Sequence, residues 1–230
     1  LVAEIDLSIP ANLGFSSAVG ALATTDFGAP WWLGALIGVG VATAIGFFNG
    51  LCITRLRMVS LIQTLSMMII LQGALLALAQ GKTITSLPEG YTWIGQATID
   101  GWPVMPLVFV VALIFMAVLL RRTVLGRSIY AVGGNAAAAN SAGIRVDRTK
   151  IVAFTIAGFL AGIGGYLLAS WQMAITSNQG SSFLLYAIAA PIIGGVSVFG
   201  GRGNVLGVFG GVMLLTVIQV GLAIIAVPSF

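Results

Sequence analysis

Long apolar runs alternate with short polar stretches along the 230 residues of this chain. A helix needs roughly 20 mostly apolar residues to cross the ~30 Å hydrocarbon core of a bilayer, and several runs reach that length. The stretch Ala11–Thr25 is rich in small residues and short for a full span, so we expect a broken or tilted helix there as a possible seventh crossing. The pattern predicts six firm spans, at Trp31–Thr54, Met58–Gln80, Val104–Leu120, Ile151–Trp171, Phe183–Gly200 and Val205–Val227.

Small residues recur every four positions along the first of these spans. Residues spaced in this way share one face of a helix. In a membrane such a face lets the backbone of another helix approach closely. We interpret it as a packing surface, formed by Gly34, Gly38, Ala42, Gly46 and Gly50.

One polar stretch, Arg121–Lys150, separates two long uncharged segments, Gly101–Leu120 and Ile151–Gly201. It holds six of the ten basic residues of the chain. Loops rich in lysine and arginine beside a membrane are usually cytoplasmic. The sequence therefore predicts that residues 121–150 form a cytoplasmic loop.

Alternation of the spans then assigns a side to the other basic residues. Arg55, Arg57 and Arg202 fall on the cytoplasmic side with the loop, and Lys82 alone falls outside. The opposite orientation would reverse this ratio, against the positive-inside tendency. The argument requires that Phe183–Gly200 crosses the membrane, because a re-entrant hairpin there would change the side of everything that follows.

Composition excludes several classes of protein. The chain is 59% hydrophobic and 7% charged, with a mean hydropathy of +1.09, whereas soluble domains carry about 25% charged residues. The net charge is +4, but the basic residues cluster at the predicted membrane edges, so we discount nucleic acid as a partner. The absence of histidine excludes histidine-dependent metal sites and triads, and the single Cys52 excludes an internal disulfide. We expect an all-α polytopic integral membrane protein, with residues 1–230 as one transmembrane domain.

The cytoplasmic loop contains one strong local pattern. Leu120–Arg127 is expected to be the end of the preceding helix as it leaves the bilayer. A glycine pair then breaks the chain, an asparagine can cap a new helix, alanines favour that helix, and a glycine can end it in a left-handed cap. The pattern predicts a short helix of about two turns with an alanine face, flanked by arginines. The residues concerned are Gly133, Gly134, Asn135, Ala136, Ala139, Gly143, Arg145 and Arg148. Such a helix is either a docking surface for a partner protein or an ordinary solvated connector.

Several ordered motifs resemble those of a known family. The loop reads GRSIYAVGGN, AAAANSA and GIRVDRTK from Gly126 to Lys150. Further matching stretches are IDLS at Ile5–Ser8, NGLCITRLRM at Asn49–Met58 and IAAPIIGGVSVFGGRG at Ile188–Gly203. Together they resemble permease subunits of ribose/xylose-type ABC importers, in the superfamily of branched-chain amino acid and sugar permeases. Those permeases are usually longer, so we expect this chain to be a truncated form.

The resemblance implies a function and a set of partners. The expected function is translocation of a monosaccharide, pentose or hexose, across the bacterial inner membrane by alternating access. The short loop helix would couple the permease to a separate ABC ATPase subunit. A periplasmic or lipid-anchored sugar-binding protein and a second permease copy would complete the importer. Nucleosides and branched-chain amino acids stay open as substrates, because Val196 and other residues depart from the usual family pattern.

Polar residues at membrane depth are the candidates for the substrate path, because unpaired polar groups in hydrocarbon cost several kcal/mol, in order of magnitude. The alternative is structural: serine and threonine often bond their own helix backbone, and an acid can cap a half-helix or pair with arginine. Asn49 and Asn204 are assigned to packing and capping. The path candidates are Asp6, Ser8, Asn12, Gln63, Thr64, Gln72, Gln172 and Asn178.

Two other classes of function fit the sequence less well. An ATP-independent secondary transporter would need ionisable residues deep in several spans, and a membrane enzyme would need clustered acids, cysteines or histidines. Gly81–Thr83 ends like a phosphate-binding loop, but Leu76 stands where that loop requires glycine. No catalytic residue, metal or cofactor is therefore expected in this chain, and ATP hydrolysis is assigned to another subunit.

Single cysteines at two positions test the expected topology. In a Cys52→Ser background, Glu89→Cys should react in intact cells with a thiol reagent that cannot cross the membrane, and Ser141→Cys should not. Inside-out vesicles should reverse the result, because the reagent then reaches the cytoplasmic loop. Labelling of both cysteines from one side would contradict the alternation of spans.

Overall fold

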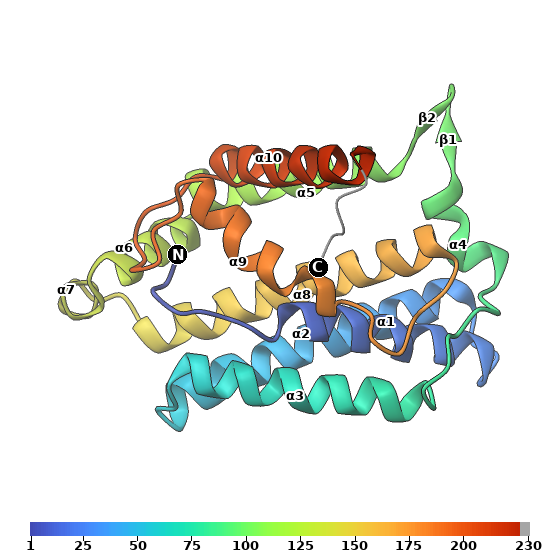
Figure 1. The fold of residues 1–230 in the computed structure, drawn as a ribbon. Coiled ribbons are helices and arrows are strands. Elements are labelled where there is room, and N and C mark those ends of the chain that lie inside the picture. The colour runs from blue at the N-terminus through green and yellow to red at the C-terminus, as the bar shows by residue number, and fades with distance from the viewer. Residues whose placement is uncertain (226–230) are drawn as a thin grey trace. The chain divides into compact units, whose positions relative to one another are not determined.

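The computed structural model describes residues 1–225, and in these residues the chain is predominantly helical (Figure 1). The single small hairpin found there pairs Thr98 with Pro103 and Ile99 with Trp102. In chain order the elements are α1 (Ile9–Thr25), α2 (Trp31–Arg55), α3 (Ser60–Leu78), α4 (Glu89–Gln96), β1 (Thr98–Ile99), β2 (Trp102–Pro103), α5 (Met105–Arg122), α6 (Val124–Gly134), α7 (Ala136–Ser141), α8 (Val146–Gln172), the 3-10 turn η1 (Ser181–Phe183), α9 (Leu184–Ile193) and α10 (Val205–Ile224). The expected all-α polytopic class is confirmed.

The chain divides into two compact units. The large unit comprises Ile5–Ala112 and Asp147–Ser182, and it contains α1 to α4 and nearly all of α8. The small unit comprises Leu1–Glu4, Leu113–Val146 and the chain from Phe183 onward. It contains α6, α7, α9, α10 and the end of α5. The interpretation of the whole chain as one permease domain stays a prediction.

Within the described residues, five helices are long and apolar enough to cross a membrane: α2, α3, α5, α8 and α10. They correspond to five of the six predicted spans. The last two residues predicted for the final span lie outside the described part of the chain. The stretch expected as a possible seventh span forms α1, a 17-residue helix with Pro10 in its first turn, and α1 is not among the five candidate spans of the described residues. Proline is tolerated there because the first helical amides have no partner inside the helix.

The prediction of a full span at Phe183–Gly200 is wrong. Helix α9 has only ten residues, and at 1.5 Å per residue it covers about half of the hydrocarbon core. It ends in a left-handed turn at Gly195, where the Val196 amide donates to the Pro191 carbonyl. Apolar composition continues through this turn to Phe199, which is why the hydropathy pattern alone suggested a longer helix.

The side assigned to Arg202 is nevertheless supported inside the small unit. Beyond α9, the turn at Gly200–Asn204 lies against the predicted cytoplasmic loop of residues 121–150, called the basic loop below. The Tyr130 hydroxyl donates to the Gly203 carbonyl at 2.9 Å, and Arg121 Nη2 donates to Asn204 Oδ1 at 2.8 Å. Within the small unit, α9 and the turn that follows it therefore reach the basic loop without one continuous helix.

Glycines bring helix backbones of the large unit into direct contact. A methyl group at Gly38 of α2 would lie 2.8 Å from the Ser16 carbonyl oxygen of α1. A methyl group at Gly46 would lie 3.0 Å from the Cα atom of Gly158 on α8, and one at Gly50 would also meet α8 backbone. The predicted packing role of the small-residue face of α2 is confirmed.

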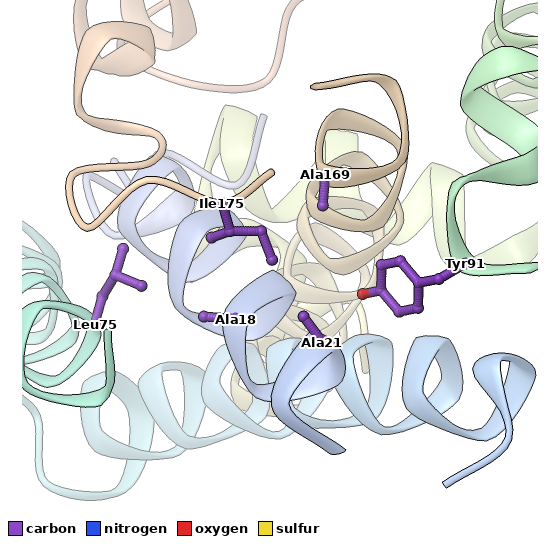
Figure 2. Packing of buried hydrophobic residues seen from close by; sticks show 6 residues of the cluster. All are labelled: Ala18, Ala21, Leu75, Tyr91, Ala169 and Ile175. Atoms are coloured by element: carbon purple, nitrogen blue, oxygen red, sulfur yellow. The ribbon is translucent and has the colours of Figure 1, made fainter. Parts of the chain in front are cut away.

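A small apolar core surrounds one face of α1 (Figure 2). The Tyr91 ring of α4 packs edge-on against Tyr166, with ring centroids 5.0 Å apart, and its hydroxyl donates to the Ser17 carbonyl at 3.5 Å. Burial raises the pKa of Tyr91 far above its ordinary value, so this hydroxyl stays a neutral donor. The buried members of the core are Ala18, Ala21, Leu75, Tyr91, Ala169 and Ile175.

The basic loop is built differently from the expected continuation of one helix over Leu120–Arg127. Helix α5 ends at Arg122, and a separate helix, α6, begins at Val124. Thr123 causes the break, because its side-chain oxygen accepts the Gly126 amide at 3.1 Å as a helix N-cap. The loop therefore consists of two short helices, α6 and α7, joined at Asn135.

The contact between α2 and α8 predicts a difference between two glycines. Gly158→Ala should destabilise the protein by about 1–3 kcal/mol, because the added methyl group meets backbone atoms that cannot turn away. Gly40→Ala on α2 should be neutral or stabilising, since a methyl group there meets nothing within 4 Å. Thermal unfolding in detergent, compared with the unmodified chain, measures both effects. Equal midpoints for the two variants would contradict the close contact.

Candidate functional site

The stretch Ile5–Ser8, ahead of α1, is non-helical and is held in place by side chains. The Ser8 amide and hydroxyl both donate to Asp6 Oδ1, at 2.9 and 2.6 Å. The Leu7 amide donates to Thr64 Oγ1 of α3 at 3.1 Å. Asp6 is thus engaged locally by Ser8, and Thr64 supplies the acceptor that this stretch of backbone lacks.

A buried chain of hydrogen bonds extends from Ser8 into two further helices. Asn49 Nδ2 of α2 donates to Ser8 Oγ at 2.9 Å, and Gln63 Nε2 of α3 donates to Asn49 Oδ1 at 3.2 Å. Asn49 is fully buried, and Ser8 and Gln63 are 1% and 6% exposed. The structure therefore brings four of the path candidates together, with Asn49 as the link. We name this cluster the buried polar network: Asp6, Ser8, Asn49, Gln63 and Thr64.

The network lies near one end of its helices. Asn49 is six residues before Arg55, where α2 ends, and Gln63 is three residues after the start of α3 at Ser60. At 1.5 Å per residue these separations are about 9 Å and about 5 Å. The arginines at this end belong to the side predicted to be cytoplasmic. The network therefore occupies the part of the large unit closest to that side.

Asn12 lies one helical turn beyond Ser8 and makes a different contact. Its Nδ2 donates to the Ala42 carbonyl of α2 at 3.0 Å. Its Oδ1 is buried and has no hydrogen-bond partner among the described residues. Buried polar atoms are rarely left in this state, because each unpaired group costs about 1–3 kcal/mol. Asn12 thus keeps one free acceptor inside the helix packing.

Three path candidates stand apart from the network. Gln72 is half-buried on α3, two turns beyond Thr64. Gln172 ends α8 and is exposed, and Asn178 is exposed in the segment that follows. These last two lie at the end of α8 and in the segment after it, which pairs with the Gly81–Trp102 connector. The pairing consists of two backbone hydrogen bonds between Ile175 and Ile84. The structure therefore does not gather all eight candidates into one site.

Gln179, the neighbour of Asn178, is a buried residue that sequence reasoning missed. Its Oε1 accepts the Thr176 amide at 3.2 Å, and its Nε2 is buried without a partner among the described residues. The segment also packs against α1, since a methyl group at Gly180 would meet the Pro10 carbonyl. Its position in a polar stretch, Gln172–Ser182, was the only sequence signal, and that signal does not separate it from its neighbours.

Sequence reasoning assigned Asn49 to packing and capping, and the structure gives it a specific role in packing. The structure shows it as the residue that joins α1 to α3 by hydrogen bonds. One signal could have found it: Asn49 is the only amide side chain within the apolar run Trp31–Thr54. An amide at that depth requires partners, because hydrocarbon offers none.

The short helix of the basic loop forms as its end residues suggested. Asn135 caps α7 by accepting the Ala138 amide on Oδ1 at 3.0 Å. At the other end Gly143 has a φ of 84°, and the Ile144 amide donates to the Ala139 carbonyl at 3.0 Å. The Gly143 amide also donates to the Asn140 carbonyl at 2.9 Å. These two bonds at the end of α7 form a left-handed glycine cap. Helix α7 is six residues long, slightly shorter than the expected two turns.

Exposure divides the loop residues into two groups. Gly133 and Ala139 are buried, so Ala139 holds α7 against the rest of the loop instead of contributing to its outer surface. The exposed residues are Gly134, Asn135, Ala136, Ala137, Ala138, Gly143, Arg145 and Arg148. The outer surface of α7 thus consists of three alanines followed by Asn140 and Ser141, with two arginines after the helix in the sequence.

Comparison with known families identifies the class of protein. Residues 1–230 match the family described as the permease component of branched-chain amino acid transport systems. The chain belongs to this family. The permease is therefore a multi-pass protein of the bacterial inner membrane, in agreement with its five candidate spans. The resemblance to ribose-type ABC importer permeases drawn from its motifs is confirmed.

Individual relatives match the whole of this permease. It is 36% identical to the ribose import permease protein RbsC of Bacillus subtilis, of which it covers 72%. It is 34% identical to the autoinducer 2 import system permease protein LsrC of Enterobacter sp., of which it covers 67%. It is 35% identical to the LsrC protein of Klebsiella pneumoniae, of which it also covers 67%. No solved structure matches the permease.

The chemistry available in the permease is recognition by hydrogen bonding. Among residues 1–225 there is no group of three histidines, cysteines or acids placed to hold a metal ion. The buried polar network offers amide, hydroxyl and carboxyl groups from α2, α3 and the non-helical stretch ahead of α1.

Asn49→Leu tests the network. The change keeps the number and branching of side-chain heavy atoms but removes the donor to Ser8 Oγ and the acceptor of the Gln63 amide, so it should destabilise the protein by about 1–3 kcal/mol. Gln72→Leu removes an amide from the same region of α3 outside the network, and it should have a much smaller effect. Thermal unfolding of both purified variants gives the comparison. The network is not a stabilising link if Asn49→Leu unfolds at or above the temperature of Gln72→Leu.

Proposed function

We propose that this permease is the membrane subunit of an ATP-driven importer that moves a monosaccharide, pentose or hexose, into the cell. The observation that carries the proposal is the similarity of the whole of this chain to import permeases for ribose and for autoinducer 2. Alternating access is the mechanism: the path opens first to one side of the membrane and then to the other, and no covalent chemistry takes place in this chain.

The chemistry of the buried polar network supports a neutral, hydroxyl-rich substrate. A sugar entering the membrane must exchange its hydrogen bonds to water for bonds to the protein. The network supplies two amides and two hydroxyls, which both donate and accept. We assign Asp6, Ser8, Asn12, Gln63 and Thr64 to the substrate path, with Gln72 beyond them and Gln172 and Asn178 toward the opposite side.

The family description favours a branched-chain amino acid as the second candidate. An amino acid carries a carboxylate and an ammonium group, and each needs an opposite charge or several donors in a desolvated site. The path candidates include one carboxyl group, Asp6, and no lysine or arginine. This imbalance favours a sugar over an amino acid.

The loop helix α7 is the proposed docking element for a separate ATPase subunit. Its exposed alanines, Ala136–Ala138, are small enough to enter a groove on a partner. Asn135 and Gly143 fix the two ends of the helix, Gly133 and Gly134 precede it, and Ala139 anchors it from inside. Arg145 and Arg148 lie just beyond it, where they can meet acidic groups on the partner.

Further subunits complete the proposed importer. A periplasmic or lipid-anchored binding protein would deliver the sugar to the outer side of the permease. A second permease copy would pair with the first around the path, as a homodimer. The ATPase would act on the cytoplasmic side, and its cycle of ATP binding and hydrolysis would drive the change of access.

Uptake of labelled sugars by cells that express the complete importer tests this function. A panel of pentoses and hexoses should reveal one that accumulates in an ATP-dependent manner. Ala137→Asp should reduce its uptake by at least about tenfold, because an isolated charge in a docking groove costs more than 1.4 kcal/mol. Membrane abundance of the variant is measured in parallel.

A matched variant separates docking from general damage. Thr98→Asp places the same charge on an exposed residue of the β1–β2 hairpin, outside the loop, and it should leave uptake unchanged. If Ala137→Asp transports as well as the unmodified permease, α7 is a connector and the docking proposal is wrong. If leucine or a nucleoside accumulates and no sugar does, the substrate class is wrong.

A further inference from the structure

Three segments of the small unit meet through their backbones at Gly133. A methyl group built at Gly133 would overlap the Leu1 carbonyl and would lie 2.6 Å from the Gly201 nitrogen. One built at Gly200 would lie 2.6 Å from the Ala3 nitrogen and 2.7 Å from the Gly133 oxygen. We call this contact the glycine junction: residues Leu1–Ala3, Gly133 and Gly200–Gly201.

Hydrogen bonds fasten the same three segments together. The Gly201 amide donates to the Leu1 carbonyl at 2.9 Å. The Tyr130 hydroxyl, one helical turn before Gly133, donates to the Gly203 carbonyl at 2.9 Å. Ala3 is held at a φ of 58°, a left-handed conformation that costs a non-glycine residue roughly 1–2 kcal/mol. The surrounding contacts must supply the free energy that keeps it there.

The backbone of the adjacent Gly134 also lies against Gly201, but a side chain at Gly134 would point into open space. A methyl group at Gly134 would meet nothing within 4 Å, and Gly134 is exposed whereas Gly133 is buried. Both residues belong to the last turn of α6, and neither has a positive φ. A glycine is therefore required at residue 133 for space alone. Substitution of Gly134 is the matched control for substitution of Gly133.

The glycine junction connects the docking helix to the substrate path along the chain. Gly133 is three residues before Ala136, where α7 begins. Gly133 and Gly134 belong to α6 and Asn135 caps α7, so the chain between Gly133 and α7 is fixed by these two helices. On the other side, Ala3 is three residues before Asp6 and five before Ser8 of the buried polar network. The third segment, Gly200–Gly201, leads directly into α10.

We infer that the glycine junction transmits movement of α7 to the segment carrying Asp6 and Ser8, with Gly133 as the positioning residue. The inference rests on the proposed docking of an ATPase on α7. Backbone atoms in direct contact have no side chains that could absorb a displacement by changing rotamer. A shift of α6 and α7 must therefore shift Leu1–Ala3, and with it the first residues of the network. Gly133 touches no substrate; it acts through the chain that follows Ala3.

The test uses the complete transporter reconstituted in proteoliposomes, with ATP hydrolysis and uptake of the transported sugar measured on the same sample. Gly133→Ala should keep ATP hydrolysis and lower the sugar transported per ATP by about tenfold, within the range known for coupling residues. Gly134→Ala should keep the unmodified ratio. A purely structural role would lower hydrolysis and uptake together and would leave their ratio unchanged, which would overturn the inference.

A milder pair of variants decides the question if Gly133→Ala does not assemble. Tyr130→Phe removes only the hydroxyl that bonds Gly203, and it should lower the transport-to-hydrolysis ratio by a few-fold. Tyr186 is half-buried on α9, outside the junction. Tyr186→Phe removes its hydroxyl and should leave the transport-to-hydrolysis ratio unchanged. Equal ratios for these two variants would overturn the inference.

The docking proposal and this inference fail in distinguishable ways. If Ala137→Asp abolishes uptake while Gly133→Ala and Tyr130→Phe keep the normal ratio, the ATPase docks on α7 but the glycine junction does not transmit its movement. If Ala137→Asp has no effect on uptake, the docking itself is absent, whatever the ratio measured for Gly133→Ala.

Discussion

Helices in a bilayer gain little from burying apolar side chains against each other, because lipid tails are equally apolar. What holds them together is close contact between backbones and the few hydrogen bonds that hydrocarbon cannot replace. Glycine makes that contact possible between α2 and α8 at Gly46 and Gly158, and between α9 and α10 at Gly194 and Gly207. Glycines at such contacts are in this sense principal packing residues, whereas others, such as Gly40, face open space.

The same constraint explains the residues around Asp6. An unwound segment at membrane depth exposes amides and carbonyls that need partners. Ser8, Asp6 and Thr64 provide partners for Ile5–Ser8, and Asn49 ties that segment to two spans. Polar side chains that stabilise an interrupted backbone are also the groups that a solute can bind. The residues that stabilise this segment of the large unit are therefore also the ones we propose for the substrate path.

Much of the architecture follows from length and hydropathy alone. The five long spans were predictable because each needs only a sustained apolar run, and the α7 caps were predictable because Asn135 and Gly143 act locally. Helix α9 was not, since its composition continues unchanged past the glycine turn at Gly195. The burial of Ala139 depends on which side of a six-residue helix faces the loop, and an alanine tract gives no periodicity to show it. The burial of Gln179 and the partners of Asn49 depend on tertiary neighbours, which the sequence does not show, although Asn49 stood out as the only amide in its apolar run.

Helix α7 has six residues, and isolated helices shorter than about 12 residues are marginal in water. Its order comes from the Asn135 side chain at one end, the Gly143 turn at the other and the buried methyl group of Ala139 beneath. A protein that binds there meets a shape that already exists. The conformational entropy of forming the helix is lost when the permease folds and not when the complex assembles, so a modest contact area can give useful affinity and fast exchange.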